Sequence, residues 1–240
     1  MRVYLNEING IPCSITSMFM SKRTWTRELE VGIRNTCKKV LDYDGFIRED
    51  ADEESLKQVT DWLNKATKWG TRHITMLKFI DFSFTVEGLH RGGQDDWDSH
   101  AKRFDNRIIR SSTRLATFGN EMSDWYKDKI MPTDAALAIL GITTPNEIDV
   151  DGVTYVKSVN GYIRKDYAED KDAKRGLYML SIPSNFIFKI NLTEWGHVYK
   201  ERNAQGTANP EVKQLCEDIA DMLEASHKQF NRELFLNIKN

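Results

Sequence analysis

The sequence predicts an α+β fold, because it contains both strand-like alternation and helix-like spacing, each bounded by turn signals. The clearest strand lies where Phe186, Phe188 and Ile190 alternate with smaller or charged residues. The clearest helix has apolar residues at steps of four and three, namely Leu29, Ile33, Cys37 and Val40. We therefore expect helices that flank a mixed or antiparallel sheet.

Length and charge limit the classes of protein to consider. With 240 residues and 40% hydrophobic content, the chain is long enough to bury one sizeable core. We expect a single domain over residues 1–240, with an insertion at about 132–172. A net charge of -2 and a pI near 6.2 argue against a general nucleic-acid or membrane-surface binder, so any anion site has to be local.

Cysteine usage and hydropathy indicate the compartment. Cys13, Cys37 and Cys216 are three scattered thiols without metal-ligand spacing, which predicts reduced cysteines and no metal site. No apolar run reaches the length of a membrane span, and the N-terminus lacks the apolar core of a signal peptide. We expect a soluble, cytoplasmic protein.

The first part of the chain predicts a strand followed by two helices. Residues 2–8 alternate as a strand, and Asn9-Gly10 is a turn signal that closes it. Residues 24–28 resemble the start of a helix, and residues 53–69 form a second amphipathic helix that ends at Gly70.

The expected insertion begins with a helix over residues 133–140 that ends at Gly141. Asp151-Gly152 and Asn160-Gly161 are turn signals about one strand apart, which predicts a β-hairpin or meander. Residues 164–172 are a charged connector. The insertion is either a lid or interface arm, or a decoration without a role.

Two helices are expected near the C-terminus. Thr193 is placed to cap a helix over residues 194–201, which ends near Arg202. The next helix begins after Asn209-Pro210, because proline suits the first helical position.

The same C-terminal residues resemble the signature of flavin-dependent thymidylate synthases. The matching run contains Arg175, Asn191, Arg202 and Ala208, followed by a Glu-Val helix start. The spacing from Arg175 to Asn191 to Arg202 fits without a gap, and one extra residue precedes Glu211.

The middle of the chain carries a second resemblance to this family. Phe82-Ser-Phe84, followed by Glu87-Gly88 and Arg91, is similar to the family's Phe-Thr-Phe…Glu-Gly-x-x-Arg segment. Ser112-Thr113-Arg114 resembles the Ser-x-Arg that closes the family's Arg-His-Arg-x-x-Ser motif. An Arg fork and a hydroxyl suit a phosphate, although a surface Ser/Arg pair explains the same residues.

The sequence departs from the family at two elements that help hold the flavin. Lys102-Arg103-Phe104 occupies the place of the Arg-His-Arg triplet, and Phe79 occupies the place of a histidine. We therefore expect FAD to bind more weakly than in typical members. Asp95, Asp96 and Asp98 lie nearby, and we interpret them as a solvated helix start rather than a hard-metal cluster.

The resemblance implies a reaction, cofactors and an assembly. The reaction is the reductive methylation of dUMP to dTMP at carbon 5 of the uracil. Methylenetetrahydrofolate supplies the carbon, NADPH the reducing equivalents, and FAD carries the hydride. Members of the family are homotetramers whose sites form between subunits, so a homotetramer is implied as well.

The resemblance also implies roles for seven residues. Arg202 contacts and polarises the pyrimidine, while Asn191 and His197 line the flavin pocket. The substrate-binding residues are those that match the family's phosphate and Glu-Gly-x-x-Arg segments: Arg175, Ser112, Arg114 and Arg91.

Three other functions stay open at this point. The chain could modify a pyrimidine nucleotide differently, for instance by hydroxymethylation. It could bind a nucleotide without catalysis after losing flavin, or it could keep only the fold as a structural protein.

Overall fold

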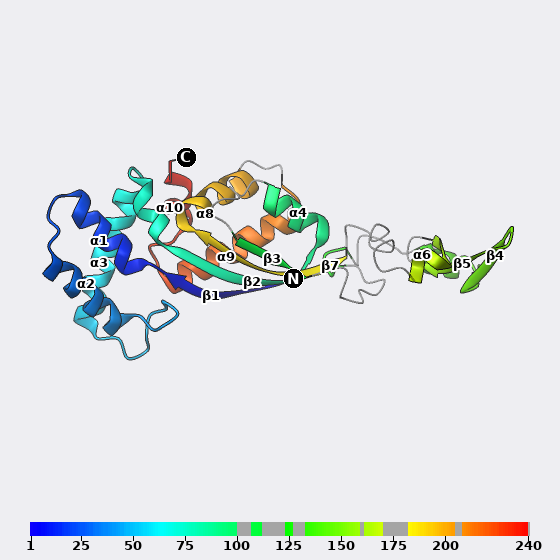
Figure 1. Ribbon diagram of the computed structural model, residues 1–240, viewed down its shortest axis with the longest axis horizontal. Coiled ribbons are helices and arrows are strands. Elements are labelled where there is room, and N and C mark those ends of the chain that lie inside the picture. Colours follow the sequence, from blue (N-terminus) through cyan, green and yellow to red (C-terminus); the bar gives the residue numbers. More distant parts are fainter. Residues whose placement is uncertain are drawn as a thin grey trace. The chain divides into compact units, whose positions relative to one another are not determined.

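The computed structural model describes residues 1–99, 107–111, 123–126, 133–158, 161–169, 182–204 and 208–239 (Figure 1). Helices and strands occur together in these residues, so the predicted α+β class is confirmed. In chain order the elements are β1 (Arg2–Asn9), α1 (Ile11–Ser21), α2 (Arg27–Val40), α3 (Glu53–Gly70), the 3-10 helix η1 (Ile74–Phe79), β2 (Asp81–His90), α4 (Arg91–Ser99), β3 (Arg107–Arg110), α5 (Thr133–Ile139), β4 (Glu147–Val150), β5 (Val153–Ser158), β6 (Gly161–Arg164), α6 (Lys165–Glu169), β7 (Pro183–Asn191), α8 (Leu192–Tyr199), the π-helix η2 (Lys200–Ala204), α9 (Pro210–Ser226) and α10 (Arg232–Asn237).

The chain divides into two compact units. The larger unit contains Val3–Val86, Asp95–Ile109 and Phe186–Asn240. The smaller unit contains Met1–Arg2, Glu87–Gln94 and Arg110–Asn185. The single domain over residues 1–240 stays a prediction.

Two sheets are present in the described residues. One has four strands in the order β1-β2-β7-β3, so β1 pairs with the distant β2. The other is an antiparallel meander in the order β4-β5-β6, which confirms the turn signals read from the sequence. The sequence predicted only a charged connector at residues 164–172, and part of it forms the helix α6.

The core of the larger unit is aromatic. Phe186, Phe188 and Ile190 of β7 are buried, whereas Asn185 just before them and Ile187 between the two phenylalanines are exposed, as the alternation predicts. Phe84 of β2 and Trp97 of α4 pack on Phe188, and the cluster continues through Trp195 of α8, which contacts Trp97 and Phe82. These four rings are at most 1% exposed. Burying rings of this size is a major source of stability, so α4 and α8 are held firmly on β2 and β7.

Helix α1 was missed by the sequence analysis. The Asn9-Gly10 pair does not close a hairpin, because Gly10 has a φ of 81° and leads directly into α1. The helix buries Ile11, Ile15 and Met18, which recur at helical spacing. A left-handed glycine serves a turn and a helix start equally well, so the Asn-Gly signal was ambiguous.

Helices α2 and α3 form where the sequence predicts them. Thr26 caps α2 by accepting a hydrogen bond from the Leu29 amide, and Asp52 caps α3 in the same way. Among the described residues, no helix combines the length and the apolar character that crossing a bilayer requires.

Candidate functional site

The candidate site is built on the connection from β7 into α8. Asn191 ends the strand and caps the helix, since its Oδ1 accepts a hydrogen bond of 3.0 Å from the Glu194 amide. The predicted cap, Thr193, lies inside the helix and donates its hydroxyl to the Ile74 carbonyl. The prediction was wrong by two residues, because both side chains are good caps and the strand decides where the helix begins.

Arg202 lies just beyond this helix, on the π-helical turn η2. Helix α8 ends at Tyr199, three residues before Arg202, and the chain continues without a break as η2 to Ala204, so helical structure extends past the end that the sequence predicted. Arg202 is only 5% exposed, which is unusual for a guanidinium without a charged partner. Single π-turns are rare and are often found at functional sites.

Asp96 of α4 is the charged partner of Arg202. The Arg202 Nη1 lies 2.8 Å from Asp96 Oδ1, and Arg202 Nη2 donates to the Asp96 backbone carbonyl. Asp96 Oδ2 also accepts from the Asn209 amide at 3.3 Å. The interpretation of Asp96 as part of a solvated helix start is therefore wrong, because it lies within α4 and holds a buried arginine.

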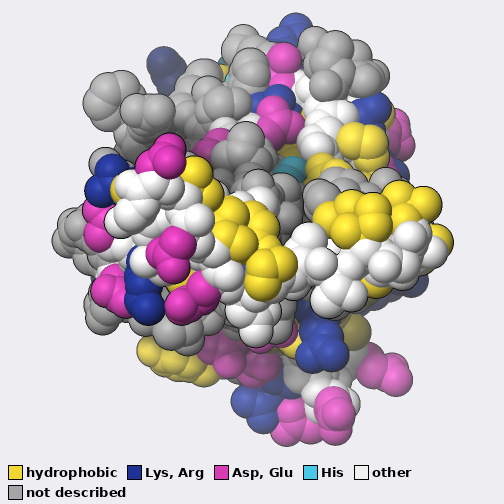
Figure 2. All heavy atoms as spheres, turned by 90° about the vertical axis from the view of Figure 1, so that its right-hand side faces the viewer, with side chains coloured by type: hydrophobic (Ala, Val, Ile, Leu, Met, Phe, Trp, Pro, Cys, Tyr) yellow, Lys and Arg dark blue, Asp and Glu magenta, His cyan; other side chains and the backbone are white. Residues whose placement is uncertain are grey.

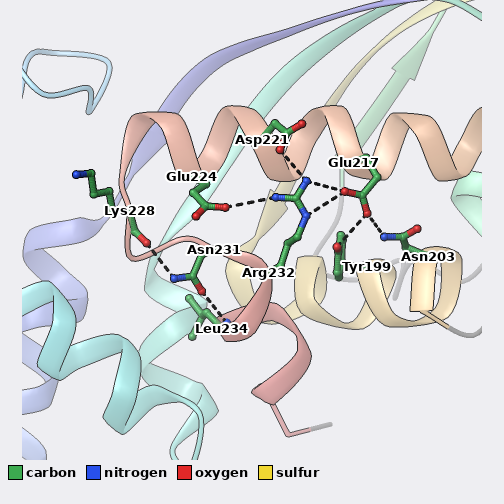
Figure 3. Close-up of polar contacts among 9 residues, drawn as sticks. All are labelled: Tyr199, Asn203, Glu217, Asp221, Glu224, Lys228, Asn231, Arg232 and Leu234. Carbon is green, nitrogen blue, oxygen red and sulfur yellow. Dashed lines mark hydrogen bonds and ion pairs between the residues drawn. The ribbon is translucent and has the colours of Figure 1, made fainter.

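A second polar network holds the residues on either side of Arg202 (Figure 3). Tyr199 donates its hydroxyl to Glu217 Oε1 at 3.0 Å, and the Asn203 amide donates to the same oxygen. Arg232 binds the other oxygen, Glu217 Oε2, through Nε at 3.0 Å and Nη2 at 2.6 Å. The η2 turn is thus tied to α9 through the residues that flank Arg202.

The charges of this network stabilise one another. Arg232 also lies 2.6 Å from Asp221 and 3.4 Å from Glu224, and these contacts with acidic groups raise the pKa of its guanidinium. Burial by itself would raise the pKa of Glu217, but hydrogen bonds from Arg232, Tyr199 and Asn203 outweigh it and lower that pKa. Glu217 is therefore ionised at neutral pH.

Helix α8 also carries buried polar atoms that need a partner. Glu194 Oε2 and His197 Nδ1 have no hydrogen-bond partner among the residues that the structure describes. The two residues are three positions apart, so they share one face of the helix. Because buried polar atoms are nearly always paired, this face is suited to a ligand with hydrogen-bonding groups.

No cysteine is poised to act as a nucleophile among the described residues near Arg202. Cys216 of α9 is fully buried, and burial raises the pKa of its thiol. Burial likewise raises the pKa of Cys37 to about 12. Both thiols are therefore protonated and unreactive at neutral pH.

Arg91 lies in the smaller unit, at the start of α4. Its backbone amide donates to the Ile182 carbonyl at 3.0 Å, and its Nη1 contacts the buried Gln94 at 3.4 Å. The backbone carbonyl of Gln94 accepts from Arg110 Nη2 at 3.3 Å, so one guanidinium contacts the side chain of this glutamine and a second contacts its backbone.

The other predicted site residues are placed as follows. Ser112, Arg114 and Arg175 lie outside the described residues, as do residues 102–104. Phe79, at the position of the family's histidine, ends η1 and is 49% exposed. The structure thus brings Arg202 together with Asp96, a residue that the sequence analysis did not select, and the assigned roles stay predictions.

Comparison with solved structures shows that the chain is similar to a known fold. One Helicobacter pylori flavin-dependent thymidylate synthase, ThyX, solved with FAD and dUMP, matches over 100% of both chains with a TM-score of 0.56 and 13% identity. A second structure of that enzyme with FAD and dUMP matches over 98% of this chain and 100% of its own, with a TM-score of 0.57 and 13% identity.

The fold is similar to that of flavin-dependent thymidylate synthases. No family's sequence profile matches the chain, and no curated protein matches it by sequence. The fold that the motifs suggested is therefore supported by a comparison that does not depend on those motifs.

Proposed function

We propose that the protein is a flavin-dependent enzyme acting on a pyrimidine nucleotide, with reductive methylation of dUMP to dTMP as its reaction. The observation that carries this proposal is the buried Arg202, which stands on a π-turn at its motif position in a chain whose whole length is similar to ThyX. Methylenetetrahydrofolate and NADPH are the proposed carbon and electron donors. A cytoplasmic homotetramer is the proposed assembly.

Arg202 is proposed to bind the pyrimidine ring. A fixed guanidinium stabilises negative charge that develops on a ring carbonyl, because it does not have to reorganise during the reaction. Asp96 and Glu217 supply that fixed position, since Asp96 holds the side chain and Glu217 holds Tyr199 and Asn203, which precede and follow Arg202 in the chain. Arg175, Ser112 and Arg114 are proposed to bind the phosphate, and Arg91 is proposed as a further substrate-binding residue.

The residues of α8 fit a flavin in part. When bound, FAD supplies hydride transfer. Glu194 Oε2 can accept from a ring N–H, and His197 Nδ1 can donate to or accept from the ring edge, so both buried atoms gain partners. Asn191 uses its oxygen as a helix cap and keeps its amide N–H groups for the cofactor. Phe79 offers only a ring surface where the family has a histidine, which supports weak binding.

The experiment that tests flavin binding is absorption spectroscopy of the purified protein, before and after addition of FAD. We expect little flavin after purification and saturable binding when FAD is added. Failure to bind FAD at high concentration would overturn the flavin-dependent function. If dUMP still bound, the protein would be a nucleotide-binding protein that has lost its cofactor, a reading that the exposed Phe79 favours.

The role of Arg202 is tested by binding of dUMP to substituted proteins. Since Arg202→Ala removes the cation that pairs with the 30% exposed Asp96 side chain, the double variant Arg202→Gln/Asp96→Asn, which replaces both charges, is the better choice. Loss of one charge-assisted contact costs roughly 1.5 to 3 kcal/mol, so we expect dUMP affinity to fall by roughly 10- to 150-fold. Arg34→Ala, which removes an exposed arginine of α2, is the matched control.

Calorimetry measures the dUMP affinity of the parent and of each variant, and a variant is compared only if its Tm equals that of the parent. Unchanged dUMP affinity in the double variant would remove Arg202 from the site.

The phosphate residues are tested by titrating the protein with dUMP and with deoxyuridine. Because several charged hydrogen bonds hold the phosphate, dUMP should bind far better than the nucleoside, and this preference should weaken as salt is added.

A further inference from the structure

A polar groove lies on the larger unit between the end of α3 and the last residues of the chain. Its volume is about 600 Å³. The residues that line it are almost all polar or charged: Asn64, Thr67, Lys68, Thr71, Arg72, Lys228, Gln229, Asn231, Glu233, Leu234, Asn237 and Lys239. We call this feature the basic groove.

The basic groove concentrates positive charge. Its four cationic residues are Lys68, Arg72, Lys228 and Lys239, and its one acidic residue is Glu233. The lining therefore has a formal charge of +3, on a chain whose net charge is -2. Within the described part of the chain, none of these four side chains forms an ion pair. The groove is the kind of local anion site that the overall charge leaves possible.

The remaining donors in the groove can be identified by accounting for hydrogen bonds. Four polar side chains already donate to backbone carbonyls: Thr67, Thr71, Asn231 and Asn237. Over the described residues, the donors that remain for a ligand are the four cations and the side-chain amides of Asn64 and Gln229. Ammonium, guanidinium and amide N–H groups are the donors that phosphate oxygens accept from.

Stabilisation of α3 explains only two of the four cations. Lys68 and Arg72 lie at the C-terminal end of α3, where cations interact favourably with the helix dipole. Lys228 and Lys239 come from the loop after α9 and from the C-terminal end of the chain, so α3 does not account for them. Figure 3 shows the ammonium of Lys228 pointing away from Glu224 and the rest of the Arg232 network.

We propose that the basic groove binds an anion with two or more phosphates, such as a nucleoside triphosphate or a polyphosphate. The choice of several phosphates rests on the groove's volume of about 600 Å³, which leaves room for more than one phosphate, and on its four cations, which can balance several negative charges. The groove shares no residue with the candidate site around Arg202. The proposal therefore stands whether or not the proposed reaction is correct.

The test is calorimetric titration of the full chain with tripolyphosphate in low and moderate salt. The groove variant is Lys68→Gln/Lys228→Gln, and the control is Lys39→Gln/Lys57→Gln, which removes two exposed lysines of α2 and α3 outside the groove. We expect the groove variant to bind roughly tenfold or more weakly, since two charge-assisted contacts are lost, and the control to bind like the parent.

The outcomes separate the possible ligands. Equal binding by parent and groove variant, equal losses in both variants, or no binding by the parent would overturn the proposal. A nucleoside triphosphate that binds more tightly than tripolyphosphate would support recognition of a nucleotide, and equal binding would support recognition of the phosphates alone. A single-stranded oligonucleotide that binds the groove more tightly than either would overturn the proposal in favour of nucleic acid. Affinity for dUMP should be the same in all three proteins.

Discussion

The strands of the two units differ in what covers them. In β7, alternate residues are almost completely buried, with Phe188 at 0% exposure. In β4 and β6, every described residue keeps some exposure; Val150 of β4 is 49% exposed, and Val153 of the neighbouring β5 is 38% exposed. The difference arises because Trp97 of α4 packs on Phe188 of β7 and is itself covered by Trp195 of α8, whereas the meander has no comparable aromatic layer in the described residues. Alternation predicts a strand, but a second layer makes it a core.

Hydrophobic exposure in the smaller unit agrees with this contrast. Ile139, Leu140 and Ile142 are 72%, 72% and 50% exposed. Hydrophobic side chains are visible at the surface on the face that Figure 2 draws. The smaller unit should therefore tolerate substitutions that the larger unit does not.

The strongest test of this comparison is to truncate one aromatic ring in each unit. Phe188→Ala should lower the free energy of unfolding by about 3 to 5 kcal/mol, because it empties a fully buried site. Tyr155→Ala, in the half-exposed β5, should cost about 1 kcal/mol. Urea unfolding of both variants gives the values. Similar losses would show that the meander has a core of its own.

Two glycines with the same backbone angle provide the next test. Gly10 and Gly152 both have a φ of 81°, so alanine should cost about 1 to 2 kcal/mol at either position. At Gly10, a Cβ would also lie 1.6 Å from the Phe79 carbonyl oxygen, whereas at Gly152 it meets no described atom within 4 Å. The clash should add about 1 to 3 kcal/mol. Equal Tm shifts for Gly10→Ala and Gly152→Ala would contradict the close approach.

Ion pairs of the two units should differ by less. Arg232→Gln removes a cation that contacts three carboxylates, and we expect a loss of about 1 kcal/mol after discounting for its 37% exposure. Lys157→Gln breaks one 3.2 Å pair with Asp134 and should cost under about 0.5 kcal/mol. Chemical unfolding in low salt measures both. A larger loss for Lys157→Gln would reverse the comparison.

The smallest expected effect is a pH dependence from His227. Burial lowers its pKa below 6.5, and the hydrogen bond to the Gly45 carbonyl offsets this only in part. The unfolded chain thus takes up the proton at higher pH than the folded chain. Stability from neutral His227 is complete above pH 6.5 and is lost as pH falls from there through the folded pKa.

The control for this prediction is His227→Gln. Its free energy of unfolding should lack the decline that the parent shows below pH 6.5. Glu217 does not interfere, because its lowered pKa places its own loss of stability below pH 4.5. An identical decline in both proteins would assign it to another group.

The sequence pattern was sufficient to predict an element wherever neighbouring residues alone determine its structure. Thr26 and Asn209-Pro210 start α2 and α9 as predicted, and the alternation of β7 names its buried face correctly. The meander follows from its Gly-containing turns. Each of these signals depends on hydrogen bonds or side-chain directions among residues that are close together in the sequence, so it can be recognised without the tertiary structure.

The surroundings of Arg202 were decided only by tertiary structure. The sequence placed Arg202 in a motif, but it did not indicate that Asp96 would be its partner or that Glu217 would hold Tyr199 and Asn203. The four cations of the basic groove are likewise brought together from separate segments. The energy of such contacts depends on where packed elements place their charges, and that placement follows from the burial of the aromatic core rather than from any spacing along the chain.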